Sequence, residues 1–375
     1  MMKKSKFIFS LLLLILTVSF VYSFDFGFTQ NSSLQVVKVV EKPLSLSGNE
    51  SVNVWAKVPM AKWATLMMDG NYALSFGANS LSNQLDLGNF YVEMDFQTSK
   101  TAKIGVDLGR IQFSDFSGLI YNNSIDGGKI DFELSDIQLK LFSGYTGLLN
   151  GKSVRFVNIL QENDSSKVYQ FAPGMLISGF STNVKNIFSN SAIGCNFSTY
   201  VVSSNREDVD TTVYAEVGIE GPLSSVLYHK VSAAMNYSAG ETKLAGVLAT
   251  GDLMYYPSFL SSSVTANVTF ATDTFYPITD TSMVFGEANS LTGLLKFSLN
   301  GSLKPISTMV VSAGADFAMD VIGSNVTKNC IQWNSSVNYQ ILSDLALNLF
   351  VAQKIALTEE SSNLFMGSAS LVLNF

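Results

Sequence analysis

The sequence offers few side chains that could carry out catalysis. Its single histidine, His229, is the residue type that hydrolases often use as a general base, and it stands beside Lys230 just after a turn at 221–225. The sequence has no HExxH pattern, no Gly-x-Ser-x-Gly elbow and no glycine loop that could cradle a phosphate. We therefore predict that the protein is not an enzyme, and that His229 lies at the rim of a membrane-spanning sheet.

The sequence also has few residues that could bind a metal ion or carry out redox chemistry. One histidine and two cysteines, Cys195 and Cys330, cannot provide the four close ligands of a structural zinc site, so we predict no metal and no cofactor. Cys195 has the same phase as Phe197, whereas Cys330 has the same phase as Gln332. The two thiols are therefore expected on opposite faces of a sheet, which argues against a disulfide between them.

The N-terminus has the pattern of an export signal. Three lysines lie within the first six residues, the uncharged stretch 7–22 follows, and the small residue Ser23 supplies a cleavage site. The apolar stretch is shorter than the roughly 20 residues that span a bilayer, so we predict a cleaved signal peptide at 1–23. Removal of its three lysines takes the formal net charge from −7 to −10. An exported protein of this charge is not expected to bind nucleic acid.

The rest of the chain repeats an alternation of period two, which is typical of β-strands with one apolar face. In the last segment one face carries Phe365, Gly367, Ala369, Leu371, Leu373 and Phe375. The segment 291–304 alternates in the same way, with only Leu294 out of phase. Charged residues make up 14% of the chain, against roughly 25% in an ordinary soluble protein. So few charges do not suit a surface that faces water on all sides.

Two all-β architectures alternate in this way. A soluble sandwich has strands of about five or six residues and many surface charges, whereas a transmembrane barrel has strands of about nine to eleven residues. The long segments and scarce charge favour the barrel, in which closure pairs every backbone amide. We predict a single all-β, antiparallel transmembrane barrel of about 16–18 strands. The predicted domains are the signal peptide at 1–23 and the barrel at 24–375, with a candidate periplasmic extension at about 24–33.

The last residues resemble the C-terminal assembly signal of bacterial outer-membrane β-barrel proteins. In that signal a terminal aromatic residue follows apolar residues at alternate positions, as Leu371, Leu373 and Phe375 do here. The resemblance implies export, recognition by the outer-membrane barrel-assembly machinery and insertion into the outer membrane of a diderm bacterium. It also implies membrane lipid as a partner.

A second segment resembles a hairpin of large porins and related substrate-selective channels. Gly109-Arg110 and the following residues to Asp115, with the Asp126-Gly127-Gly128 sequence after them, match its "GR, loop, DG" pattern. The resemblance implies that Arg110 lines the pore. Arg110 shares its phase with Leu108, however, so it would point to lipid unless Gly109 marks a bulge. A position in the polar rim above the lipid is the alternative.

The phase of each strand also predicts an inner wall. Charged side chains are hydrated inside a water-filled barrel and costly on the lipid side, so they are expected to point inward. The predicted pore-lining residues are Glu93, Asp95, Arg110, Asp131, Glu133, Glu216, Glu220, Lys296, Lys304, Asp316 and Asp320. Because this set is slightly acidic, it favours a mild preference for cations or neutral solutes. Alternatively, these charges pair with one another across strands.

These observations lead to two hypotheses about function. The first is a porin-like outer-membrane channel for passive diffusion of small hydrophilic solutes. The second is a surface-exposed binding or adhesion barrel with a plugged lumen and functional extracellular loops. The long link at about 145–171 fits either hypothesis, because it could fold into the pore or lie outside it. The sequence leaves the oligomeric state open.

Overall fold

The protein is described by a computed structural model. The described residues are 24–40, 42–77, 80–154, 156–157, 164, 166–187, 192–204, 211–239, 245–279, 291–323, 325–358 and 363–375. They contain no helix long and apolar enough to cross a membrane. The predicted signal peptide at 1–23 lies outside the described residues and remains a prediction.

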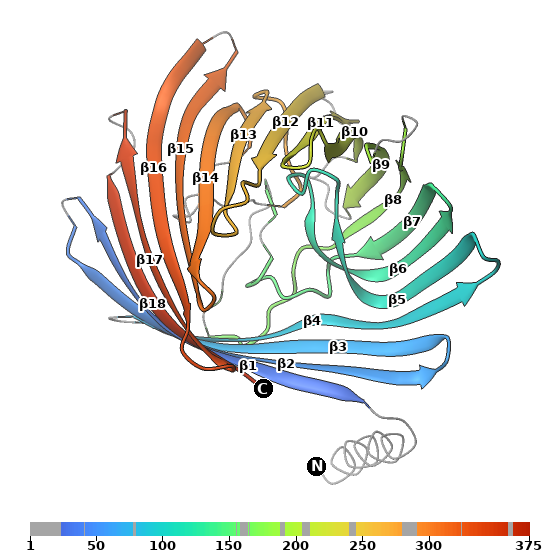
Figure 1. The fold of residues 1–375 in the computed structure, drawn as a ribbon, viewed down its shortest axis with the longest axis horizontal. Helices are drawn as coiled ribbons and strands as arrows, with labels where there is room; N and C mark the ends of the chain where they lie inside the picture. Colours follow the sequence, from blue (N-terminus) through green and yellow to red (C-terminus); the bar gives the residue numbers. More distant parts are fainter. Residues whose placement is uncertain are drawn as a thin grey trace.

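All regular structure in this part of the chain is β-strand (Figure 1). The strands are β1 (Asp25–Val39), β2 (Ser45–Ala61), β3 (Ala64–Gly77), β4 (Ser80–Gln97), β5 (Ala102–Ser114), β6 (Asn122–Leu134), β7 (Ile137–Tyr145), β8 (Met175–Val184), β9 (Gly194–Ser204), β10 (Thr212–Pro222), β11 (Leu227–Ser238), β12 (Ala245–Tyr255), β13 (Ser263–Ala271), β14 (Leu294–Ile306), β15 (Met309–Ile322), β16 (Asn325–Gln340), β17 (Leu345–Ala356) and β18 (Leu364–Asn374). Most exceed the length of an ordinary strand, as the long alternating segments predicted.

The sheet closes on itself. Each strand pairs antiparallel with the next along the chain, and β1 pairs with both β2 and β18, so the 18-stranded sheet has no free edge. This confirms the predicted all-β antiparallel barrel, at the upper limit of the expected 16–18 strands. One expectation was wrong. Residues 25–33 form the first part of β1 and pair with β18 and β2, so they are not an extension that precedes the barrel.

The C-terminal residue completes the closure. The Phe375 N–H donates to the Phe28 oxygen at 2.9 Å, the Phe28 N–H donates to the Phe375 oxygen at 3.0 Å, and the two rings stack with centroids 4.7 Å apart. Leu371 and Phe375 are exposed on the outer face, where the assembly signal would have to be read. Recognition of this strand by the assembly machinery remains a prediction.

The two faces of the sheet differ as the alternation predicted. On β11, Val231 and Met235 are exposed on the outer face, whereas Ser232 and Ala234 are buried on the inner face. Both chain ends of the barrel lie at one end, which we call the turn end. The opposite end, which we call the loop end, carries the β5–β6, β7–β8 and β13–β14 links at 115–121, 146–174 and 272–293. These three links form the site described next.

Candidate functional site

The β5–β6 hairpin leaves the wall of the barrel about two thirds of the way along β5. The pairing of β4 with β5 ends at Phe90 and Arg110, although β5 and β6 remain paired as far as Ser114 and Asn122. In Figure 1 the link between the two strands projects into the space that the barrel encloses. The inner face of this part is apolar, with Ile111 and other residues of the hairpin buried.

A row of three glycines allows the hairpin to bend inward. Gly109 of β5 lies opposite Gly127 of β6, which lies opposite Gly144 of β7. Gly109 has a φ of 132°, and a Cβ there would overlap the Phe90 carbonyl oxygen; a Cβ on Gly127 would overlap the carbonyl oxygen of Ser143. Only residues without a side chain let these backbones approach so closely.

Replacement of Gly127 with alanine is therefore expected to destabilise the folded barrel. The new methyl group has backbone rather than a flexible side chain in its way, so we expect a cost of about 1–3 kcal/mol. Gly105→Ala is the matched control on the neighbouring strand, because a Cβ there lies 3.6 Å from its nearest neighbour, an oxygen of Asp95. Urea unfolding followed by gel mobility compares the two. Equal stability of both variants would contradict the tight contact.

The tip of the hairpin is fastened to the far wall. The backbone N–H groups of Phe116 and Ser117 donate to the two oxygens of the Glu216 carboxylate on β10, at 3.0 and 2.9 Å. The Lys230 ammonium on β11 donates to the Phe116 carbonyl at 2.5 Å and lies 4.4 Å from the centre of the Phe116 ring. Gly218 leaves the space that this ring fills. Glu216 was predicted to line the pore. Its side chain is only 1% exposed and instead anchors the tip of the hairpin.

Asp115 shapes the tip from within. Its carboxylate accepts hydrogen bonds from the backbone N–H groups of Gly118, Ile120 and Tyr121, at 2.8, 3.0 and 2.6 Å. Burial raises the pKa of the Tyr121 phenol, and the neutral hydroxyl donates to the Ser124 carbonyl at 2.7 Å. A carboxylate that accepts several N–H groups holds a turn in one conformation. The tip is thus a fixed part of the structure.

Two other links meet this hairpin inside the barrel. The N–H groups of Ile278 and Thr279, from the 272–293 link, donate to the Ile120 carbonyl at 2.8 and 3.1 Å. Val157, from the 146–174 link, donates its N–H to the Ile278 carbonyl at 3.1 Å. Phe156 also forms a β-bridge with Thr279. Segments far apart in the sequence therefore join into one inward-folded body.

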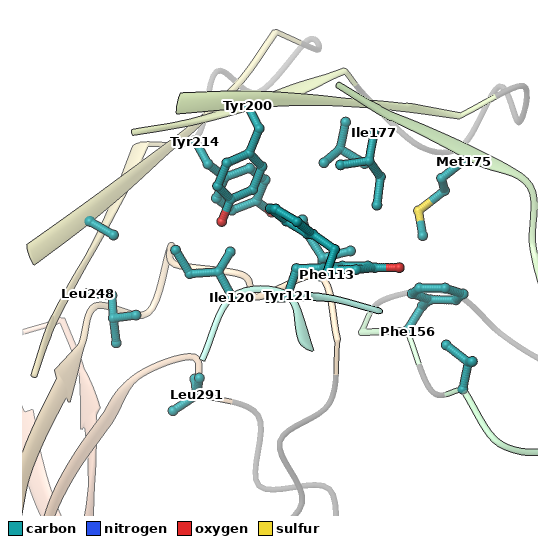
Figure 2. Close-up of a cluster of buried hydrophobic side chains, with 14 of the residues drawn as sticks. Phe113, Ile120, Tyr121, Phe156, Met175, Ile177, Tyr200, Tyr214, Leu248 and Leu291 are labelled. Atoms are coloured by element: carbon teal, nitrogen blue, oxygen red, sulfur yellow. The ribbon is translucent and has the colours of Figure 1, made fainter. Parts of the chain in front are cut away.

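An apolar cluster holds this body against the inner wall (Figure 2). Phe113 of the hairpin packs on Phe142 of β7 with ring centroids 4.0 Å apart. On the wall, Tyr200 stacks on Tyr214 with ring centroids 5.2 Å apart, and the Tyr214 hydroxyl donates to the Tyr276 carbonyl at 2.8 Å. A cluster of aromatic residues in the lumen narrows the barrel near its loop end.

Arg110 does not line the pore. Its side chain is only 6% exposed and forms a bidentate pair with Asp126, at 2.8 and 2.9 Å. It also donates to the carbonyls of Leu87 and Leu148, at 2.9 and 2.7 Å, and to the Tyr169 hydroxyl at 3.4 Å. Arg110 therefore occupies the place where the wall divides: it joins β4, the inward hairpin and the 146–174 link. The prediction that it is pore-lining was wrong.

The 146–174 link takes the place of β5 beside β4, where the β5–β6 hairpin has turned inward. Leu85 on β4 donates its N–H to the Val168 carbonyl at 3.1 Å, and the Asn150 side chain donates to the Leu85 carbonyl at 2.9 Å. Asn150 and Phe171 form a β-bridge within the link itself. The part of β4 before Phe90, which does not pair with β5, is thus covered by the link, so part of this link belongs to the wall and part lies in the lumen.

Below the hairpin, the inner wall of β4–β6 carries a charge network. Lys103 pairs with Asp95 at 2.9 Å, and Lys129 pairs with Asp107 at 2.8 Å and with Asp131 at 3.2 Å. The predicted lining residues Glu93 and Glu133 lie opposite Asp107 and Lys103 on the neighbouring strands. On this wall acids and lysines pair across strands, which was the alternative interpretation.

The remaining predicted residues are spread around the wall. Asp316 lies opposite Gln332 on the face that buries Ala318, and Asp320 accepts a hydrogen bond from the Asn329 side chain at 3.0 Å. The other three positions are Glu220 opposite Lys230, Lys296 opposite Thr269 and Lys304 near the turn end.

The residues considered for catalysis and redox chemistry lie on three different strands, β9, β11 and β16. Cys195 and Cys330 are both free thiols. His229, on the outer face, lies opposite Gly221 near the turn end.

The geometry defines a class: a closed 18-stranded barrel whose lumen is narrowed by inward-folded links. The same fold is found in Pseudomonas aeruginosa OpdQ, with a TM-score of 0.64 and 8% identity over 94% of this chain and 99% of that one. OccK2 (OpdF) of that organism, solved in complex with glucuronate, has a TM-score of 0.63 and 10% identity over 94% and 98% of the chains. Its outer membrane protein opdK has a TM-score of 0.60 and 9% identity over 94% and 99%.

These likenesses establish the fold. No family model matches the sequence, and no curated protein matches it. The chain therefore has the architecture of the outer-membrane Occ/Opd porins at a sequence identity of about a tenth.

Proposed function

We propose that the protein is a porin-like channel in the outer membrane of a diderm bacterium, through which small hydrophilic solutes diffuse passively. The observation that carries this proposal is the closed 18-stranded barrel with a charged inner wall below the constriction. A barrel of this width is too wide for its own strand side chains to fill. The inward-folded hairpin then selects what passes, because it leaves less than the full width of the lumen.

A bilayer recording tests the proposal. The purified mature barrel is added to a planar bilayer, and stepwise increases of current are expected as single channels insert. Barrels unfolded by heat serve as the control, and they should give no steps. A folded preparation that inserts into liposomes but conducts no ions would overturn the proposal.

We expect a modest preference for cations over anions. The inner wall carries Glu93 and Glu133 in addition to the acids paired with lysines, so the local charge favours cations. In a salt gradient of potassium chloride, the reversal potential is therefore expected to have the sign of a potassium-selective pore. The double change Glu93→Gln and Glu133→Gln should move the reversal potential toward zero. Glu50→Gln, on the outer face, is the control and should leave it unchanged.

One observation favours a second candidate, a barrel whose lumen is plugged and whose outer links bind a partner. The three inward links form a body with fully buried side chains, including Phe275 and Tyr121. If this body closes the lumen, the wild-type barrel conducts nothing. Shortening the tip at 115–121 would then create conductance where the wild type has none. Conductance in the unmodified barrel excludes this candidate.

A further inference from the structure

The inner faces of β1, β2 and β3 are the part of the wall that the inward-folded body leaves accessible. On other strands inward side chains are covered: Tyr200 of β9, Leu248 of β12 and Lys354 of β17 are at most 2% exposed. Among the described residues, no inward side chain of Thr29–Gln35 or Ser47–Asn53 is buried. A solute that passes the constriction therefore moves along this side of the barrel.

This stretch of the inner wall consists of uncharged polar side chains. Every inward residue of Thr29–Gln35 and of Ser47–Asn53 carries a hydroxyl or an amide, and Asn71 and Ser75 continue the pattern on β3. We call these inward polar positions the amide wall. Asn53 lies directly between Thr29 and Asn71 in the pairing of the three strands, so the groups form rows across the wall.

The nearest inward charges border the amide wall. Asp86 of β4 lies opposite Asn71, and Asp69 accepts a hydrogen bond from the Asn89 side chain at 2.5 Å. The amide wall itself holds no lysine, arginine or carboxylate at its inward positions. An anionic solute is recognised by cationic donors and a cation by carboxylates, so neither is matched here. Amides and hydroxyls both donate and accept, as the hydroxyl groups of a neutral solute do.

The amides at the middle of this wall are available for a ligand. Asn53 and Asn71 lie opposite each other, and among the described residues neither side chain makes a hydrogen bond to the protein. The Oδ1 atom of Asn31 is also without a partner. Elsewhere on the inner wall such groups satisfy one another: the Asn338 amide donates to Asn348 at 2.5 Å. The amide wall thus keeps donors and acceptors that another molecule can use.

An aromatic ring lies at the end of the same row. Trp55 follows Asn53 on the inner face of β2 and is 41% exposed, although it faces a lumen lined by polar groups. Its ring lies over Gly27 of β1, where an added Cβ would come within 2.8 Å of it. The electron-rich face of an indole attracts the polarised C–H groups of a sugar ring. A few placed polar groups beside an apolar surface are the usual composition of a binding site for a small molecule.

We propose that the amide wall and Trp55 bind neutral polyhydroxylated solutes, sugars and polyols, on their way through the barrel. The C–H face of the solute packs on Trp55, and its hydroxyls exchange hydrogen bonds with Asn53 and Asn71. The inference rests on the proposed channel function and names the substrate class of that channel. A sugar acid is bound less well, because the amide wall has no cationic partner for its carboxylate.

Fluorescence of Trp55 tests binding whether or not ions pass. The sequence has three tryptophans, so Trp63→Phe with Trp333→Phe leaves Trp55 as the sole reporter in the refolded barrel. Glucose is expected to change its emission saturably. Glucuronate, which carries a carboxylate on the same ring, should need a concentration about tenfold higher, as one lost hydrogen-bonding match of about 1.4 kcal/mol implies. No response to glucose, or an equal response to glucuronate, would overturn the proposal.

Asparagine pairs on two parts of the wall provide matched variants. In the same background, Asn53→Leu with Asn71→Leu is expected to raise the half-saturating glucose concentration by about tenfold or more, because two amides are lost. Asn338→Leu with Asn348→Leu is the control, since those amides bind each other, and should leave it unchanged. Gel mobility checks folding. Equal effects of the two variants would show that sugars respond only to the general polarity of the lumen, and would overturn the assignment to the amide wall.

Currents through single channels separate this inference from the channel function itself. In potassium chloride, added glucose should reduce the current saturably, beyond the change in solution conductivity, because bound sugar obstructs ions. Channels that conduct potassium but are not blocked by glucose leave the channel function standing and overturn the inference. Saturable Trp55 fluorescence in a barrel that conducts nothing overturns the channel and leaves the sugar site.

Discussion

Replacement of Arg110 with methionine is expected to lower the free energy of unfolding by about 3 kcal/mol, because it leaves the partly buried Asp126 carboxylate, 19% exposed, without its partner. The guanidinium is 6% exposed and holds Asp126 through two hydrogen bonds. The change also strips a donor from the carbonyls of Leu87 and Leu148, which lie where the wall divides. Urea unfolding of the refolded barrel, followed by gel mobility, measures the loss.

An exposed lysine–aspartate pair in the same sheet provides the control. Lys103 and Asp95 lie 2.9 Å apart, but their side chains are 40% and 47% exposed. Solvent screens such a pair, so Lys103→Met is expected to cost no more than about 1 kcal/mol. The double change Arg110→Met with Asp126→Leu should recover part of the loss, because no unpaired carboxylate then remains at this site. Equal effects of Arg110→Met and Lys103→Met would show that the Arg110 pair does not hold the wall together.

The wall of the barrel could be predicted from the sequence because, within each strand, alternate residues face the lipid and the lumen. Leu371, Leu373 and Phe375 alternate with Ser370, Val372 and Asn374, and the structure places the first set on the outer face and the second on the inner face. Charged residues such as Asp131 and Glu93 then had to point inward. Closure follows from the same argument, because an open edge would leave backbone amides unpaired in lipid.

The inward-folded body could not be predicted in the same way, since it consists of contacts between distant segments. A local sign of it was nevertheless present in β5. Up to Leu108 the even positions are apolar, whereas beyond Gly109 the odd positions Ile111 and Phe113 are apolar and buried. Arg110 lies where the apolar phase changes face, so neither the pore nor the lipid was the correct environment.

A second sign lay in β14. Leu294 breaks the alternation of its segment because it points into the lumen, where it is 3% exposed and belongs to the apolar cluster. An apolar residue in the inner phase near the loop end of a strand thus marks contact with an inward link. Met175, at the start of β8, follows the same rule. An alternating pattern whose inward positions become apolar therefore marks where links fold inward and narrow the lumen.

Glu216→Leu is expected to release the tip of the hairpin from the far wall. The carboxylate holds the N–H groups of Phe116 and Ser117, and hydrogen bonds to a charged group contribute about 1.5–3 kcal/mol each. Loss of both should lower the ratio of docked to undocked tips by roughly a hundredfold or more, since each 1.4 kcal/mol is a factor of ten. Leucine keeps the side-chain volume, so the wall itself should remain folded.

Two measurements follow the released tip. Chymotrypsin added from the loop end should cleave near Phe116 and Tyr121 in Glu216→Leu but not in the wild type, and this readout does not depend on conductance. The single-channel current of Glu216→Leu should also be larger than that of the wild type, because the constriction at the tip widens. Asp316→Leu, on the inner face of β15, makes no bond to the tip among the described residues and should alter neither. If cleavage and current stay unchanged in Glu216→Leu, the tip is held by its apolar contacts, and the far-wall carboxylate does not set the width of the pore.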